Sequence, residues 1–396
     1  MIPDLRTFYN DHFTEEKYQI FCAERSARFQ KKIEFKICET PVFIPESFRD
    51  KLFLAGEQII DKICAPDFLH KTQHAIPMHV NVPGAEGKPA FIALDFGICK
   101  GPEGEPEPQL IEMQGFASLY AWQHDLGMSY KKHFNISDGV HHILNGKSNE
   151  AYVAQLTETL LGGYAPEHVI LLEIEPEKQK TWIDFWLTRA WTGIEPVCIT
   201  KIIPEGDKIF YMRNGVKTRI HRIYNRLIFD ELLERKDLQY AWNLTDPTDV
   251  EWVCHPNWFF RISKYTLPLI QSPFVPETHF VHTLTSIPTD LENWVLKPLF
   301  SFAGHGVIFH VTEQDIAKAQ AHGDAFILQR KVEYIPVIET PDIPAKCEIR
   351  LMYLWDQKEE RPQLVINLAR LSKGVMIGVD YNKNKSWVGG TVGYFK

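Results

Sequence analysis

Three oxygen-bearing side chains lie on two segments that have the character of β-strands. Asp95 stands inside the apolar run 91–98, and Glu112 and Gln114 stand two positions apart in the segment 109–116. Residues two apart on a strand face the same side, and a carboxylate inside an apolar run is costly unless a partner compensates its charge. Mg²⁺, which takes oxygen ligands from one or two carboxylates plus substrate phosphates, is one such partner. An amphipathic hairpin whose acids face water is the alternative.

A lysine followed by two glycines forms a second chemical pattern. In the stretch 294–311, an apolar run ends at Lys297, Gly304 and Gly306 follow, and a second apolar run occupies 307–309. We expect a strand, a glycine loop and a strand. Loop glycines let backbone N–H groups approach a polyanion without a Cβ in the way, and a lysine at the strand end can reach the same phosphates. The spacing matches neither a Walker A loop nor a GxGxxG loop, and a solvated hairpin is the alternative.

Length, composition and charge limit the class of protein. The chain has 396 residues, of which 44% are hydrophobic and 24% charged, and its formal net charge is −8. These values are typical of a globular protein with two or three domains. They show no basic excess, which argues against nucleic acid or an anionic membrane as the main partner.

Targeting signals and cysteine usage favour the cytoplasm. We find no run of 18 apolar residues, as a transmembrane helix would need, and no signal-peptide pattern near the first residue. The seven cysteines are scattered and include no CxxC pair. We therefore expect reduced thiols in a cytoplasmic protein, without a disulfide framework or a zinc site.

Hydrophobic periodicity predicts the elements that position the acidic residues. Apolar residues at helical spacing predict helices over 13–32 and 48–63, which we interpret as packing elements. The segments 91–98 and 109–116 flank a loop rich in Pro and Gly at 100–108, which predicts an antiparallel hairpin with a long tip.

The segment 165–235 has a different character. A strand at 168–172, a helix at 180–191 and a strand at 195–199 predict a small α/β domain with a partly parallel sheet. An Asn-Gly pair predicts a hairpin over 208–219.

Four further polar residues have a functional and a simpler interpretation. Arg222 and Arg226 could bind an acidic substrate, or they could be charges that flank a surface element and need no function. The adjacent His141 and His142 resemble metal ligands, but neighbouring residues on a helix point in different directions, so we interpret them as a solvated pair.

The last third of the chain contains the remaining candidate residues. A helix over 258–270 would contain Lys264, and two strands would carry Arg350 and Arg370. The other predicted elements are a helix at 312–322, a strand at 325–332, the two strands at 347–355 and 363–371, and a glycine-rich hairpin around 387–390.

The order of these motifs resembles the ATP-grasp superfamily, and in particular its circularly permuted branch, which includes glutathionylspermidine synthase and related peptide-type ligases. In most ATP-grasp ligases the carboxylate strands come last, whereas here DFGI…LIEMQGF at 95–116 precedes the lysine and glycine loop at 297–306. The stretch with YNR at 224–226 looks like the pre-grasp domain of that branch. KYTLPLI resembles the helix before the nucleotide lid, WVLKPLFSFAGHGV the lid strand and phosphate loop, and AFILQRKV the strand beside adenine.

The resemblance implies a mixed α+β and α/β architecture, in which two α+β subdomains clamp ATP and a small α/β pre-grasp domain adjoins them. It implies four regions in permuted order. These are N-terminal helices with the metal-binding half of the core at 1–135, the pre-grasp domain at 136–250, the lid subdomain at 251–335, and the rest of the core at 336–396.

The resemblance also implies which residues bind the nucleotide. Lys297 would contact the α- and β-phosphates, with Lys264 as a second candidate from the preceding helix. Gly304 and Gly306 would let the loop fold over the phosphates. The residues that would line the adenine pocket are Gln329, Lys331 and the backbone of Val332.

Metal binding and catalysis fall to other residues under the same resemblance. Asp95 and Glu112 would ligate Mg²⁺, and Gln114 would add an amide oxygen. Arg350 and Arg370 would lie near the transferred phosphoryl group.

The implied activity is ATP-dependent ligation of a small-molecule acid to an amine or peptide through an acyl phosphate, with release of ADP and phosphate. Two departures from the family pattern leave alternatives open. The family usually has Asn where Gln114 stands, and glutathionylspermidine synthase has Arg where Ala93 stands. A catalytically silent ATP-binding protein on the same fold is the second hypothesis, and a scaffold that binds no nucleotide is the third.

Overall fold

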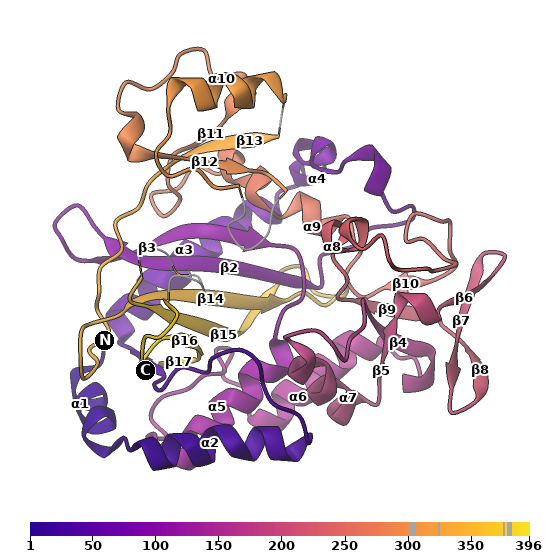
Figure 1. The fold of residues 1–396 in the computed structure, drawn as a ribbon, viewed down its shortest axis with the longest axis horizontal. Helices are drawn as coiled ribbons and strands as arrows, with labels where there is room; N and C mark the ends of the chain where they lie inside the picture. The colour runs from indigo at the N-terminus through magenta and orange to yellow at the C-terminus, as the bar shows by residue number, and fades with distance from the viewer. Residues whose placement is uncertain (301–305, 324, 375–376, 378–381) are drawn as a thin grey trace.

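The computed structural model describes residues 1–300, 306–323, 325–374, 377 and 382–396 (Figure 1). The chain has a mixed α+β fold with several separate sheets. None of the helices within these ranges is long and apolar enough to cross a membrane.

A five-stranded antiparallel sheet forms the centre of the molecule. Its order is β16-β15-β14-β2-β3, so the predicted hairpin β2–β3 is confirmed and continues into strands from the far end of the chain. The strands are β2 (Phe91–Lys100), β3 (Pro106–Gln114), β14 (Lys346–Leu354), β15 (Gln363–Ser372) and β16 (Gly389–Thr391).

The two faces of this sheet differ in chemistry. One face carries charged side chains, because Asp95 lies opposite both Glu112 and Arg350, and Glu348 lies opposite Arg370. The other face is apolar and packs against two helices, α3 (Glu46–Ile63) and α5 (Tyr120–Phe134). The alternation of side chains along each strand therefore separates a core face from a polar face.

A smaller sheet lies above the central one in Figure 1. It is antiparallel, with the order β11-β13-β12, and α10 (Glu313–Ala321) covers it through the apolar side chains of Trp294, Leu296 and Ile316. Its strands are β11 (Thr278–Phe280), β12 (Trp294–Pro298) and β13 (Phe326–Arg330). We call these strands and α10 the upper subdomain.

A parallel sheet forms the right side of the molecule in Figure 1. Its order is β10-β9-β4-β5, which confirms the predicted parallel pairing, and the predicted hairpin appears as β7–β8 in a separate antiparallel sheet. The elements of this region are α6 (Asn149–Leu161), β4 (Val169–Glu173), α7 (Trp182–Thr192), β5 (Glu195–Cys198), β6 (Ile203–Glu205), β7 (Lys208–Arg213), β8 (Val216–Arg219), β9 (Arg222–Asn225), α8 (Phe229–Glu234) and β10 (Glu251–Trp252).

A segment near the start of the chain pairs with the last strand. Strand β1 (Val42–Ile44) pairs in parallel with β17 (Gly393–Phe395), and α2 (Glu15–Arg28) packs against α5. The predicted glycine-rich hairpin is wrong, because β16 joins the central sheet whereas β17 joins β1. Helix α1 (Pro3–His12) also lies in this region, whereas α4 (Phe68–Lys71) lies above the central sheet in Figure 1.

Two other predicted elements differ in the structure. The helix over 258–270 is wrong as one element, since it is divided into α9 (Trp258–Arg261) and the 3₁₀ helix η5 (Lys264–Leu269). Ser263 causes the break, because its side chain accepts a hydrogen bond from the backbone of Tyr265 and starts a new helix. Among the residues that the structure describes, the second apolar run at 307–309 forms a single bridge, between Ile308 and Leu296, in place of a full strand.

Candidate functional site

Asp95 holds two arginines on the polar face of the central sheet. Arg350 donates to it through Nε and Nη2 at 2.5 and 2.7 Å, and Arg370 donates through Nη2 at 2.6 Å. Burial alone would raise the pKa of Asp95, but the two guanidinium groups outweigh it and hold that pKa below its usual range. Asp95 is thus an ionised carboxylate with both oxygens engaged. Of the two arginine side chains, that of Arg370 is 33% exposed and that of Arg350 only 7%.

Glu348 and Tyr334 extend this charged cluster, and the sequence did not single them out. Glu348 lies 3.8 Å from Arg370 and accepts a hydrogen bond from the hydroxyl of Tyr334. Burial raises the pKa of Glu348 although Arg370 opposes it. The sequence could have indicated Glu348, because it stands two positions before Arg350 on one strand and so faces the same side.

Gly97 makes room for Tyr334. A Cβ at Gly97 would lie 2.6 Å from a ring carbon of Tyr334, so a side chain there would displace the ring. Backbone hydrogen bonds hold the same segment, since Lys100 donates to Glu333 at 2.8 Å and Ile335 donates to Ile98 at 3.1 Å. The connection from β13 to β14 is therefore tied to β2 beside the charged cluster.

Lys297 and Lys264 share an electrostatic environment with Glu112. Burial lowers the pKa of Lys297 to about 8, Glu112 opposes this lowering, and Lys264 adds to it. Burial also lowers the pKa of Lys264, again against the attraction of Glu112. Both lysines thus lie within the electrostatic range of the carboxylate on β3.

Both lysines form hydrogen bonds at the end of β12. Lys264 Nζ donates to the carbonyl of Pro298 at 3.2 Å, next to Lys297 in the chain. Lys297 Nζ donates to Gln329 Oε1 at 2.5 Å. Gln329 lies on β13 and donates in turn to Thr278 Oγ1 at 3.1 Å. Three of the residues expected around the nucleotide are thus brought together.

The other residues expected around the nucleotide are placed less closely. Lys331 Nζ donates to the carbonyl of Glu292 at 2.6 Å, and Val332 is half-buried in the connection after β13. Gly306 has a φ of +72°, which favours glycine. Gly304 lies outside the described residues.

Gly115 joins β3 to the segment that carries Lys264. Its N–H donates to the carbonyl of Ile262 at 2.9 Å, and a Cβ there would lie 2.4 Å from the carbonyl oxygen of Trp258. Only glycine allows this close approach between backbones. The contact brings the start of η5 against the end of the strand that carries Glu112.

The oxygen donors of β3 fit a cation that also binds substrate phosphates. No group of three or more His, Cys, Asp or Glu side chains within the described ranges is placed to hold a metal ion. Asp95 is engaged by arginines, which argues against its expected role as a ligand. Glu112 and Gln114 lie on one face of β3 and are half-buried. Mg²⁺ needs no more than one or two protein carboxylates when phosphates complete its shell.

The fold resembles that of a known protein. The chain superposes on a glutathione synthetase-like effector from Globodera pallida, in its apo form, with a TM-score of 0.59 and 10% sequence identity, covering 91% of this chain and 90% of that one. The two chains share a fold. No protein-family model and no curated protein sequence matches this chain.

Two arginines outside the charged cluster are buried. Arg226 is buried and donates to Asp184 at 2.6 Å, and Arg222 donates to the backbone carbonyls of Leu160 and Thr159 at 3.0 Å each. The interpretation of both as flanking surface charges is wrong. Their buried charges are compensated by partners from the same domain.

The histidine pair is not solvated as a pair. His141 is exposed, but His142 is buried, with Nε2 lying 3.2 Å from Nδ1 of His124. Burial lowers the pKa of His142 to about 3 and that of His124 to about 4. Both rings are therefore neutral near pH 7, and the interpretation as a solvated pair is wrong for His142.

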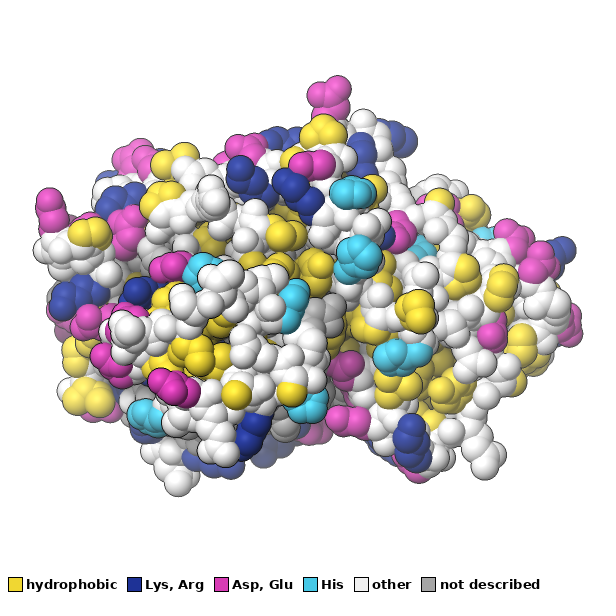
Figure 2. All heavy atoms as spheres, turned by 90° about the horizontal axis from the view of Figure 1, so that it is seen from above, with side chains coloured by type: hydrophobic (Ala, Val, Ile, Leu, Met, Phe, Trp, Pro, Cys, Tyr) yellow, Lys and Arg dark blue, Asp and Glu magenta, His cyan; other side chains and the backbone are white. Residues whose placement is uncertain are grey.

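On the part of the surface that the structure describes, two open hollows lie away from the charged cluster. One of about 470 Å³ includes Met78, Glu86 and Arg261, and one of about 360 Å³ includes Glu175, Lys178 and Arg235. On the face shown in Figure 2, acidic and basic side chains are interspersed, without a broad basic patch.

Proposed function

We propose that this protein is an ATP-dependent carboxylate–amine ligase of the ATP-grasp type, working through an acyl phosphate. The observation that carries the proposal is that Lys297, Lys264 and Gln329 meet at the end of β12, while Gly115 ties the segment before Lys264 to the end of the strand that carries Glu112. Ammonium groups suit phosphate oxygens, and a carboxylate on the opposing sheet suits the cation that accompanies a triphosphate. The similarity to a glutathione synthetase-like protein supports this class at the level of the fold.

The order of the strands is consistent with a permuted ATP-grasp core. Strands β2 and β3 precede the upper subdomain in the chain, yet they share the central sheet with β14 and β15, which follow it. In the proposed arrangement the upper subdomain is the nucleotide lid, and the triphosphate lies between it and the polar face of the central sheet.

The proposed reaction has two steps. A carboxylate oxygen of the acid attacks the γ-phosphorus of ATP, and the bond to the leaving oxygen of ADP breaks. The nitrogen of the amine then attacks the acyl carbon, phosphate leaves, and the nitrogen loses a proton. The product is an amide.

The chain's own side chains have separate roles in these steps. Lys297 and Lys264 bind the phosphates and offset their charge. Arg370, oriented by Asp95, is the more accessible of the two guanidinium groups and would face the transferred phosphoryl group. A Mg²⁺ ion held by Glu112 and Gln114 would neutralise charge on the phosphate oxygens.

A silent ATP-binding protein remains the second candidate, and two observations favour it. Ala93 stands opposite Gln114 on the polar face, so that position supplies no positive charge to the phosphates. Asp95, expected to help bind the metal, is engaged by two arginines instead. Both features bear more on turnover than on nucleotide binding.

Calorimetry with Mg·ATP combined with an ADP-release assay tests the proposal. We expect the protein to bind Mg·ATP and to release ADP faster when amino acids, polyamines or short peptides are supplied as acid and amine. Lys297→Ala and Glu112→Ala should abolish turnover, since one such contact is worth about 3–4 kcal/mol in a transition state. Lys318→Ala, an exposed lysine on α10, is the matched control.

The outcomes separate the candidates. Binding without stimulated ADP release would favour the silent protein over the ligase. No heat of binding and no thermal shift with Mg·ATP would leave only a scaffold role.

A further inference from the structure

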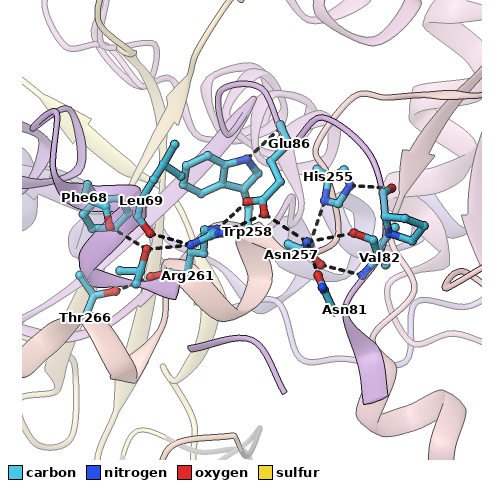
Figure 3. Close-up of polar contacts among 12 residues, drawn as sticks. Phe68, Leu69, Asn81, Val82, Glu86, His255, Asn257, Trp258, Arg261 and Thr266 are labelled. Atoms are coloured by element: carbon cyan, nitrogen blue, oxygen red, sulfur yellow. Dashed lines mark hydrogen bonds and ion pairs between the residues drawn. The ribbon is translucent and has the colours of Figure 1, made fainter. Parts of the chain in front are cut away.

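A half-buried polar cluster joins the segment before β2 to helix α9 (Figure 3). Arg261 donates to Glu86 through Nε at 2.5 Å and through Nη2 at 2.8 Å. Asn257 Nδ2 donates to Asn81 Oδ1 at 2.9 Å and to Glu86 Oε1 at 3.2 Å. We call these four side chains, Asn81, Glu86, Asn257 and Arg261, the clasp.

Backbone groups are also part of this junction. Asn257 exchanges two hydrogen bonds with the backbone of Val82, at 3.0 and 3.1 Å, and Trp258 Nε1 donates to the carbonyl of Glu86 at 3.1 Å. Arg261 Nη1 donates to the carbonyl of Leu69 at 3.0 Å. The helix is thus fixed in rotation as well as in position, because Asn257 and Arg261 contact the side chain of Glu86 while Trp258 contacts its backbone.

The clasp lies between two parts of the proposed nucleotide site. The segment that contains Glu86 leads directly into β2, which carries Asp95. Arg261 is followed three positions later by Lys264, and its carbonyl accepts a hydrogen bond from Thr266 Oγ1, within η5, at 2.6 Å. Arg261 therefore contacts the segment before β2 through its side chain and η5, which contains Lys264, through its backbone.

The charged residues of the clasp suit the orientation of α9 better than the stability of the fold. Arg261 is only 9% exposed and Asn257 only 2%. Burying an ion pair costs desolvation, and apolar residues of similar volume often stabilise a core equally well. A fully hydrogen-bonded network, by contrast, permits one arrangement of the elements that it joins.

We propose that the clasp positions Lys264 for the phosphates of the nucleotide by fixing α9 and η5 against the segment before β2. The inference rests on the proposed function, because it needs Lys264 to contact a phosphate. Glu86 and Arg261 are positioning residues in this arrangement. They act through η5 and do not touch the nucleotide.

The test compares the affinities of ATP and AMP in clasp variants. Arg261→Lys keeps the charge but loses the two-pronged contact with Glu86, and we expect it to weaken Mg·ATP binding about tenfold, as loss of a supporting contact commonly does. AMP has only the α-phosphate and lacks the β-phosphate that Lys264 would also reach, so its affinity should change less than that of ATP. The matched control is Arg361→Lys in the exposed pair of Arg361 with Glu57, which should change neither affinity.

A double variant separates positioning from general loosening. Lys264→Ala should itself weaken ATP binding, and adding Arg261→Lys should weaken it no further, because both changes remove the same contact. Additive losses, or equal losses for ATP and AMP, would overturn the clasp proposal. Glu86→Gln provides the same comparison if Arg261→Lys does not fold.

The results also distinguish this inference from the proposed function. If Lys264→Ala leaves ATP binding unchanged, the assignment of the nucleotide site fails, and the role of the clasp fails with it. If Lys264→Ala weakens ATP binding while Arg261→Lys and Glu86→Gln do not, the nucleotide site stands and only the clasp is refuted.

Discussion

Asp95 and Arg350 face each other across β2 and β14 and form two hydrogen bonds, at 2.5 and 2.7 Å, although 255 positions separate them in the chain. The pair is almost completely buried. Arg370, on the next strand, forms a second ion pair with Asp95. The carboxylate that the sequence suggested for metal binding thus organises two arginines.

Replacing Asp95 by Asn should destabilise the protein. The amide keeps the shape of the side chain but leaves the buried Arg350 without a counter-charge, which typically costs about 3–5 kcal/mol. Urea unfolding should show a lower midpoint with an unchanged slope. Glu57→Gln, which breaks the exposed pair with Arg361, should cost about 1 kcal/mol or less. Equal losses in the two variants would contradict the role given to Asp95.

The affinity for ATP should depend on pH through Lys297. Its pKa of about 8 means that the free protein loses this proton as the pH rises through 8, whereas phosphates favour the charged form. The dissociation constant for Mg·ATP should therefore be nearly constant from pH 6 to 7 and rise above pH 8, by up to about tenfold per pH unit.

Two lysine variants identify the titrating group in that experiment. Lys297→Arg should remove the pH dependence, because a guanidinium does not lose its proton in this range. Lys318→Arg, on the same subdomain, should retain it. A dependence that survives in Lys297→Arg would assign the titration to another group.

Gly115→Ala should weaken both folding and nucleotide binding. The added Cβ would meet the backbone oxygen of Trp258 at 2.4 Å, so α9 must shift, and overpacking of this kind costs about 1–3 kcal/mol. Because α9 leads into η5, the affinity for ATP should fall as well. Gly139→Ala is the control, since a Cβ there makes only an ordinary contact at 3.5 Å. Thermal unfolding and calorimetry on both variants measure the two effects.

The buried pair of His124 and His142 should make the protein sensitive to acid. Burial lowers both pKa values, to about 4 and about 3, whereas an unfolded histidine has a pKa of about 6.5. Below pH 6.5 the unfolded chain therefore binds more protons, and the free energy of unfolding should fall as the pH drops towards 4. The limit is about 1.4 kcal/mol per pH unit for each histidine.

His142→Gln should flatten this dependence, while His141→Gln, at the exposed neighbouring position, should not. Urea unfolding at several values of pH between 4 and 7 makes the comparison. Identical profiles for the two variants would show that another group causes the acid sensitivity.

Local patterns were sufficient for many elements of this fold. The hairpin β2–β3 was predictable because two strand-like apolar segments flank a loop rich in Pro and Gly, and both features are properties of neighbouring residues. The helix over 258–270 was predicted wrongly, because Ser263 caps a new helix and so breaks the element in spite of its apolar periodicity. The order of acidic strands, lysine and arginine strands was also visible in the sequence, and it led to the family resemblance.

The sequence by itself determined which residues could carry charge chemistry: Asp95 and Glu112 on one hairpin, Lys297 before its glycines, and Arg350 and Arg370 on a later pair of strands. Only the tertiary structure decided their partners. It inserted β14 between β15 and β2, so Asp95 met arginines, and it surrounded His142 and Arg226 with protein. The physical reason is that burial and Coulomb energy depend on distances in space, which the pairing of remote strands sets and local sequence patterns do not encode.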